Sequence, residues 1–303
     1  MARAVLSNPL KLEAHYYNVI FAPARVMNEF TKSHGLGNDY LVFEEKSLSF
    51  DLTPEAVRLL CDRRLGVGAD GILLMVDSEK SDFGLRIFNP DGSEAEKSGN
   101  GLRIFAKFLR ERGHAGANAF SIETPGGEAR AETTEKDGGV CAVTVDMGRA
   151  VFREGADKIR AGGKSFEFTA VSVGNPHCVI FTESPNADDT KLLGPLIENH
   201  EFFPGRTNVQ FARAVSKDRL EIFIWERGAG YTLASGSSSC AAAAAAVRKG
   251  LCESPLIAAM PGGELNIEVS PAFEIRMTGP AEEVATGNLS GDMLKKLSGM
   301  RGR

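Results

Sequence analysis

The chain has 303 residues, of which 25% are charged and 43% hydrophobic, and its formal net charge is -5. This mild negative charge gives no electrostatic reason to expect nucleic acid or an anionic membrane as a partner. No apolar run is long enough to span a bilayer, so we expect no membrane partner. The length fits two domains of about 130 to 140 residues, each large enough to bury a core.

The five cysteines are an odd number and are scattered along the chain without a Cys-x-x-Cys pair. No zinc-finger spacing or His-Glu-x-x-His motif is present, so we expect no metal site. This cysteine usage is typical of the reducing cytoplasm. Residues 1–26 lack the sustained apolar core of a signal peptide, and we interpret them as a leader outside the fold.

The sequence after the leader predicts strands over residues 28–33 and 40–43 around a loop, 34–39. Thr53 is a good N-cap, Pro54 suits the first helical position, and a helix is expected from there to Gly66. Further strand-like segments are 72–76, 82–88, 120–123 and 140–146. A second helix should begin at Ser98 and cover Gly99 to Arg112, because its apolar residues repeat at helical spacing.

The second part of the chain shows a similar pattern. Strands are predicted at 166–173, 178–181, 209–212, 220–225, 265–269 and 273–277. An alanine-rich helix is predicted over Ser237 to Lys249, and its small side chains would let it lie close inside a surrounding sheet. We therefore predict an α+β fold in which each half is an antiparallel sheet wrapped around a central helix.

Several motifs recur at an interval of about 137 residues, which indicates an internal duplication. Ser98-Gly99-Asn100 recurs as Ser235-Gly236-Ser237, and Gly37-Asn38 recurs as Gly174-Asn175. We predict two pseudo-symmetric domains with an active-site cleft between them. We assign residues 27–146, joined by the C-terminal segment 278–303, to the first domain and residues 147–277 to the second.

The two serine turns would each place a hydroxyl at the start of a helix. Unpaired N–H groups and the positive end of the helix dipole favour an anion there. Two such helix starts facing one cleft would bind a carboxylate and place one hydroxyl on each side of a single carbon. The simpler interpretation is that each serine only caps its own helix, but the duplicated context favours a functional pair.

Seven ordered motifs, spread over residues 28–277, resemble those of the diaminopimelate epimerase family. The motifs are His34-Gly35-Leu36-Gly37-Asn38-Asp39, Gly66-Val67-Gly68-Ala69-Asp70-Gly71, Asn89-x-Asp91-Gly92-Ser93-Glu94, Gly99-Asn100-Gly101, Gly174-Asn175-Pro176-His177, Thr207-Asn208-Val209 and Glu226-Arg227-Gly228-x-Gly230. The second motif also matches a dinucleotide fingerprint, but it follows a helix and precedes a strand, which is the wrong order.

The resemblance implies epimerisation at an amino-acid α-carbon without pyridoxal phosphate or any other cofactor. In the family, one thiolate removes the proton and a thiol on the opposite face delivers another, and these cysteines correspond to Ser98 and Ser235 here. An alkyl hydroxyl is a far weaker acid than a thiol, so a serine needs another group to take its proton. His177 and Glu226, which the resemblance places beside the pair, are the candidates.

The resemblance also implies a set of substrate-binding residues. The distal amino-acid end would be held by Asn89, Asn175, Asn208 and Arg227, whose side chains suit a zwitterion. The carboxylate at the reacting end would bind N–H groups of Gly99, Asn100, Gly236 and Ser237, and Asn38 is also assigned to the site.

The expected function is the interconversion of LL- and meso-diaminopimelate, with a small-molecule amino acid as the partner. Three alternatives stay open: an isomerase or dehydratase of the same fold, a ligand-binding protein without turnover, and a chain whose catalytic cysteines were deliberately replaced. A homodimer is expected from the resemblance.

Overall fold

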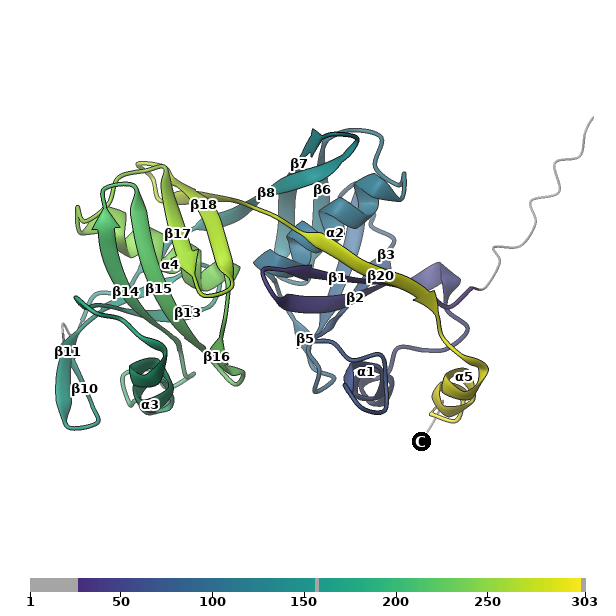
Figure 1. The fold of residues 1–303 in the computed structure, drawn as a ribbon, viewed down its shortest axis with the longest axis horizontal. Coiled ribbons are helices and arrows are strands. Elements are labelled where there is room, and N and C mark those ends of the chain that lie inside the picture. The colour runs from purple at the N-terminus through teal and green to yellow at the C-terminus, as the bar shows by residue number, and fades with distance from the viewer. Residues whose placement is uncertain (1–26, 156–157, 301–303) are drawn as a thin grey trace, which may run out of the picture.

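The computed structural model describes residues 27–155 and 158–300, which form two lobes lying side by side (Figure 1). Each lobe is a curved sheet wrapped around one long helix, α2 (Gly99–Glu111) in the first and α4 (Gly236–Arg248) in the second. The predicted α+β fold with two pseudo-symmetric halves is confirmed. The predicted leader, 1–26, lies outside the described residues.

The first half runs from β1 to β8. Its elements are β1 (Glu29–Gly35), β2 (Asn38–Glu44), the short helix η1 (Glu45–Ser47), α1 (Pro54–Cys61), β3 (Ile72–Val76), β4 (Phe83–Phe88), β5 (Glu94–Ala95), α2, β6 (Ala119–Thr124), β7 (Gly127–Lys136) and β8 (Gly139–Arg149). β1 and β2 extend into the predicted loop and leave only Leu36 and Gly37 as the turn, with φ angles of 57° and 89°.

The predicted helix starts are confirmed, and one predicted helix end is wrong. Thr53, Ser98 and Ser235 each cap a helix with the side-chain oxygen. α1 ends at Cys61 rather than near Gly66, because the next residue leaves the helical conformation with a ψ angle of 123°.

The second half runs from β9 to β19. Its elements are β9 (Val151–Phe152), β10 (Lys158–Ala161), β11 (Lys164–Glu167), β12 (Thr169–Ser172), β13 (Pro176–Phe181), α3 (Ala187–Glu198), β14 (Asn208–Ser216), β15 (Arg219–Glu226), β16 (Gly230–Thr232), α4, β17 (Leu256–Met260), β18 (Gly263–Val269) and β19 (Glu274–Gly279). The sequence pattern does not indicate helix α3 or the strands β5, β7, β9, β10, β16 and β17. The strand predicted at 166–173 is two strands, β11 and β12.

The two halves repeat one pairing pattern. In the first half β2 pairs in parallel with β3 and β4 with β6, and in the second half β13 pairs in parallel with β14 and β15 with β17. Hairpin neighbours such as β6 and β7, or β17 and β18, are antiparallel, and the turns between them contain Pro125-Gly126 and Pro261-Gly262. Each sheet is therefore mixed rather than purely antiparallel as predicted, because β2, β4, β13 and β15 each also have a parallel neighbour. The duplication indicated by the motifs is also present in the strand pairing.

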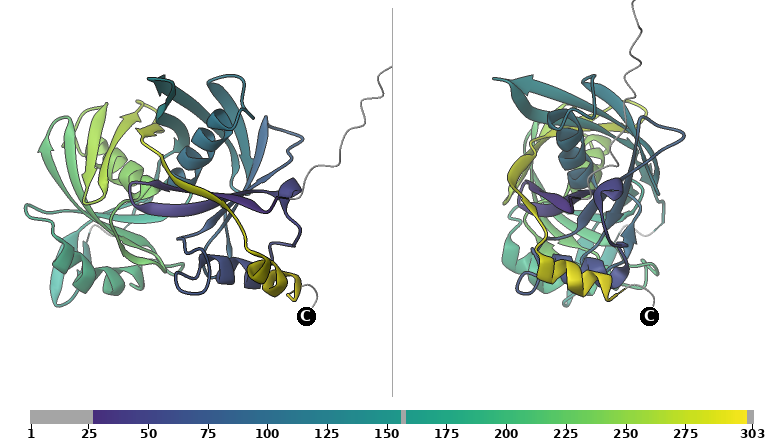
Figure 2. Two further views of the ribbon diagram at one scale, coloured as in Figure 1. Left: turned by 45° about the vertical axis from the view of Figure 1, so that its right-hand side comes forward. Right: turned by 90° about the vertical axis from the view of Figure 1, so that its right-hand side faces the viewer.

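The end of the chain returns to the first half. After β19, which pairs with β8, the strand β20 (Glu282–Asn288) pairs antiparallel with β1. Figures 1 and 2 show this yellow strand crossing from one lobe to the other, followed by α5 (Gly291–Ser298). Leu289 and Leu297 then join the apolar cluster that α1 forms with β2 and β3.

The core of the second half forms around the alanine run of α4. All six alanines of this run, 241–246, are completely buried, as the small side chains predict. Their size lets β12, β13, β14 and β18 approach the helix closely. Within the described part of the chain, no helix is both long enough and apolar enough to cross a membrane.

Candidate active site

The starts of α2 and α4 meet at the junction of the two halves. Gly99 and Gly236, the first residues of these helices, touch each other: a Cβ atom on Gly236 would lie 3.4 Å from the Cα atom of Gly99. Ser98 and Ser235 precede them with extended backbones, and their hydroxyl oxygens accept N–H groups of their own helices at 3.1 and 3.5 Å. The two predicted serines therefore flank one junction, rather than lying in separate parts of the molecule.

Glu226 lies next to Ser235. It is the last residue of β15, and its carboxyl group shares a hydrogen bond with the Ser235 side chain. Burial raises the pKa of Glu226 above its usual value, the hydrogen bond from Ser235 opposes this shift, and the negative charge of Asp70 adds to it. A carboxylate held in this way is a stronger base than an exposed one.

Tyr40, which was not among the predicted site residues, lies beside Ser98. Its hydroxyl oxygen lies 3.2 Å from the Ser98 Oγ atom. Tyr40 directly follows the motif that ends at Asp39, so its nearness to that motif was the only signal in the sequence.

His177 is completely buried and engaged on both ring nitrogens. Its Nε2 atom lies 2.8 Å from Asn175 Oδ1, and its Nδ1 atom lies 3.1 Å from the Gln210 amide nitrogen. Gln210 also donates to Ser238 in the first turn of α4. Burial, together with a smaller contribution from the nearby Arg227 charge, lowers the pKa of His177 to about 3. The imidazole is therefore neutral and is bonded to Asn175, a predicted binding residue, rather than to a catalytic serine.

Asn38 and Asn100 form a polar chain beneath the start of α2. Asn100 donates to Asn38 Oδ1 at 3.1 Å and accepts from the Arg103 guanidinium at 2.9 Å. Arg103 is completely buried and also donates to the backbone carbonyl of Pro280, which belongs to the segment entering β20. Burial lowers the pKa of Arg103 to about 10, so the side chain still places a positive charge under the helix start at neutral pH.

The residues predicted to hold the distal end of the substrate lie on loops and strand ends. Asn208 connects two segments, because it donates to Pro176 O at 3.0 Å and accepts the Arg227 N–H at 2.9 Å. The Arg227 side chain is exposed and donates to a loop carbonyl at 3.1 Å. Asn89 bonds Ser93 within its own loop. The structure thus joins Asn208 to Arg227 and Asn175 to His177, and it places Asn89 in a separate loop.

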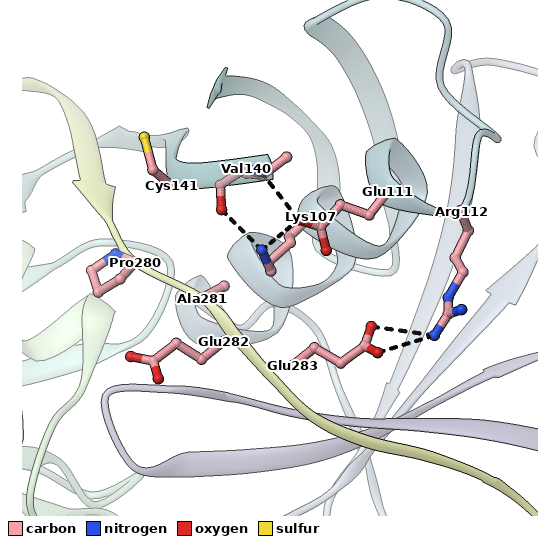
Figure 3. Close-up of a pocket in the computed structure, with 9 residues that line it drawn as sticks. All are labelled: Lys107, Glu111, Arg112, Val140, Cys141, Pro280, Ala281, Glu282 and Glu283. Carbon is pink, nitrogen blue, oxygen red and sulfur yellow. Dashed lines mark hydrogen bonds and ion pairs between the residues drawn. The ribbon is translucent and has the colours of Figure 1, made fainter. Parts of the chain in front are cut away.

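A hollow of about 610 Å³ lies elsewhere, on the flank of α2 (Figure 3). Lys107 pairs there with Glu111 and Arg112 pairs with Glu283, while Glu282 pairs with His34, which does not line the hollow. None of the predicted site residues lines it. The chemistry therefore points to the serine junction, not to this hollow, as the candidate active site.

Known proteins resemble this chain over most of its length. A family model described as diaminopimelate epimerase matches residues 30–153 and 169–284. The chain is 48% identical over 275 residues to diaminopimelate epimerase 2 of Nostoc sp. strain PCC 7120, covering 86% of this chain and 95% of that protein. It is 42% identical over 273 residues to the diaminopimelate epimerase of Pelotomaculum thermopropionicum, covering 85% and 97%.

Solved structures with much lower identity share the fold. A probable proline racemase from Agrobacterium radiobacter with bound carbonate has a TM-score of 0.71 at 15% identity, covering 87% of this chain and 93% of that chain. A hydroxyproline epimerase from Agrobacterium vitis with bound trans-4-hydroxy-L-proline has a TM-score of 0.69 at 13% identity, covering 88% and 93%. The architecture is therefore one found in racemases and epimerases. Within it, the chain belongs to the diaminopimelate epimerase family.

Proposed function

We propose that this protein is an isomerase that interconverts LL- and meso-diaminopimelate. The reaction removes the hydrogen from one α-carbon and delivers another to the opposite face, without a cofactor. The contact between the two helix starts carries this proposal. The contact of Gly99 with Gly236 supports a site in which Ser98 and Ser235 act on opposite faces of one α-carbon.

On one face, Ser235 and Glu226 act as a base. The Ser235 oxygen takes the α-proton while its own proton passes to the Glu226 carboxylate, so the negative charge stays off the alkyl oxygen. On the other face, the Ser98 hydroxyl delivers a proton to the carbanion. Glu226 thus takes the proton of Ser235, which is the assistance that a serine needs when it replaces a thiol as the base.

The helix starts stabilise the charge that develops during the reaction. The first N–H groups of an α-helix have no acceptor within the helix, so those of Gly99, Asn100, Gly236 and Ser237 can bind the substrate carboxylate. Electron density moves from the α-carbon into this carboxylate as the proton leaves. Fixed donors directed at that charge are worth about 10²–10³ in rate each.

His177 acts as a positioning residue in this proposal. Gln210 bonds its Nδ1 atom, which leaves the proton on Nε2, and that N–H then holds Asn175 by its oxygen. The Asn175 amide NH₂ therefore points away from the imidazole, where it can donate to the distal carboxylate. Asn208, Arg227, Asn89 and Asn38 complete the proposed binding set.

Deuterium exchange tests the proposal. LL-Diaminopimelate incubated with the protein in heavy water should become meso-diaminopimelate that carries deuterium at the inverted carbon. Binding of LL-diaminopimelate without exchange would show that the protein does not turn this substrate over. If the double variant Ser98→Cys, Ser235→Cys then recovered activity, the protein would be a binding protein that has lost its catalytic thiols. Exchange on a different carboxylate substrate alone would instead support an isomerase or dehydratase of the same fold.

Substitution of Glu226 tests the proposed base. Glu226→Gln keeps the shape but removes the proton acceptor, so kcat should fall by about 10²–10⁴. Glu221→Gln is the matched control on the same strand, since its carboxylate faces solvent and pairs with Arg213 at 2.9 Å. Equal loss in both variants, or none in Glu226→Gln, would contradict the assignment.

We further propose a homodimer in the cytoplasm. The five cysteines are all free thiols, which agrees with a reducing compartment. Sedimentation of the purified protein tests the dimer, and a monomer at micromolar concentration would contradict it.

A further inference from the structure

Tyr40 is fixed in a buried position beside Ser98. Only 7% of its surface is exposed, and its hydroxyl lies 3.2 Å from Ser98 Oγ. The ring packs on Gly71, where a Cβ atom would lie 2.7 Å from the ring carbon Cε1. Since β2 pairs on one side with β1 and on the other with β3, the backbone of Tyr40 cannot shift to release this contact.

The hydrogen bonds at Ser98 define what its hydroxyl can do. A serine hydroxyl has one hydrogen to donate and two lone pairs to accept with. One lone pair accepts the Gly101 N–H at 3.1 Å. If the Tyr40 hydroxyl donates to the second, the Ser98 hydrogen is left free to point toward a substrate in the junction.

We propose that Tyr40 is a catalytic residue that works with Ser98 as a pair of hydroxyls on one face of the substrate. This role rests on the proposed epimerase function. The Ser98 O–H bond breaks as its proton joins the α-carbon, whose lone pair forms the new C–H bond. The Tyr40 proton moves to the Ser98 oxygen, and the negative charge comes to rest on the phenol oxygen. A solvent proton then restores Tyr40, and the proton held by Glu226 returns to solvent.

The acidity of the phenol fits this role. Burial raises the pKa of Tyr40 to about 12, and the negative charge of Glu226 contributes to the shift. The phenol therefore stays protonated at neutral pH and can donate to Ser98. It is still a stronger acid than an alkyl hydroxyl, so it can accept a charge that Ser98 alone would hold poorly.

A double-mutant cycle with Tyr40→Phe and Ser98→Ala tests the pair. Tyr40→Phe removes only the hydroxyl, and kcat for LL- to meso-diaminopimelate should fall about 100-fold, the loss expected for one donor to a developing oxyanion. The double variant should be no slower than Ser98→Ala. A further loss in the double variant, or parental activity in Tyr40→Phe, would overturn the pairing.

Exchange in heavy water gives a readout that a structural defect would not produce. With the Ser98 face impaired, the epimer whose α-hydrogen faces Ser235 should still exchange it for deuterium, now with retention of configuration. The other epimer should exchange slowly. Equal slowing of exchange for both epimers would overturn the assignment of Tyr40 to one face.

Two controls distinguish a failure of the Tyr40 proposal from a failure of the epimerase proposal. Tyr231→Phe removes the hydroxyl of another tyrosine, whose ring lies 4.8 Å from the Lys191 ammonium, and it should keep the parental rate and melting temperature. A parent chain inactive on both epimers would overturn the epimerase function and this role together. An active parent with an equally active Tyr40→Phe variant would overturn the role of Tyr40 alone.

Discussion

The burial of His177 ties its protonation to the folding of the whole chain. Its pKa is about 3 in the folded protein and near 6.5 when the chain is unfolded, because burial disfavours the charged ring. Between these two values the unfolded chain binds a proton that the folded chain does not. The contribution of the neutral His177 ring to the free energy of unfolding is therefore complete above about pH 6.5 and is lost as the pH falls toward 3.

Replacement of His177 should change how the free energy of unfolding depends on pH below about 6.5. In His177→Gln the free energy of unfolding should fall less steeply below pH 6.5, by about 1.4 kcal/mol per pH unit. Urea titrations at several pH values measure this slope. Above pH 7 the parent and variant curves should run parallel, and an unchanged slope at pH 4 to 6 would contradict the neutral, buried state of the ring.

Individual site residues were predictable only within local motifs. Ser98, Ser235, His177 and Glu226 were named from the motifs, and the structure brings the serines to one junction. Tyr40 and Gln210 were not named, because their partners, Ser98 and His177, are 58 and 33 residues away in the chain. Contacts over such distances depend on sheet pairing, which no local pattern specifies.

At the starts of the two central helices, α2 and α4, only the glycines Gly99 and Gly236 lie between the two backbones. A Cβ atom at Gly236 would lie 3.0 Å from Met277 Sδ and 3.4 Å from Gly99 Cα. A methyl group there would push the two helix starts apart by a few tenths of an ångström. Such a shift would also move Ser98 and Ser235 apart, since each directly precedes one of these glycines.

Gly236→Ala should therefore lower kcat more than it lowers stability. We expect a fall of about 10-fold to 100-fold in kcat, since small misplacements in a two-base site are costly. Gly291→Ala is the matched control, because Gly291 is also the first residue of a helix but has no atom within 4 Å of its Cβ position. Calorimetry and initial rates on both variants test this, and parental kcat in Gly236→Ala would contradict it.

Elements with strong local signals were predicted, and those that depend on distant partners were not. N-caps and the alanine run were sufficient to predict α2 and α4. Strand β20 has almost no buried side chains, so it lacks the alternating pattern that marks a strand. It forms because β1, more than 240 residues earlier, offers it a hydrogen-bonding edge.

At the scale of the whole molecule, the two ends of the described chain belong to one half. β20 pairs with β1, and α5 covers the cluster around α1. This arrangement supports our proposal that residues 278–303 belong with 27–146, and that residues 147–277 form the other domain. The pairing of β8 with β19 connects the two sheets directly.

Leu297 tests how strongly α5 holds the first half together. Its side chain is 1% exposed, so Leu297→Ala should lower the free energy of unfolding by about 2–5 kcal/mol. Hydrogen exchange should quicken in β20 and β1 before it does in β14 and β15. Leu192→Ala, at a position 67% exposed, should have little effect, and equal effects of the two substitutions would contradict this prediction.

The return of β20 to β1 also constrains how the protein is made. On the ribosome, β1 emerges before every other described strand and β20 after all of them, so the nascent first half keeps an open sheet edge during most of translation. Strands β12 to β19 find their partners among themselves and β8 or β9, and can assemble earlier. Cotranslational folding should therefore finish last in the first half, although most of that half is synthesised earlier.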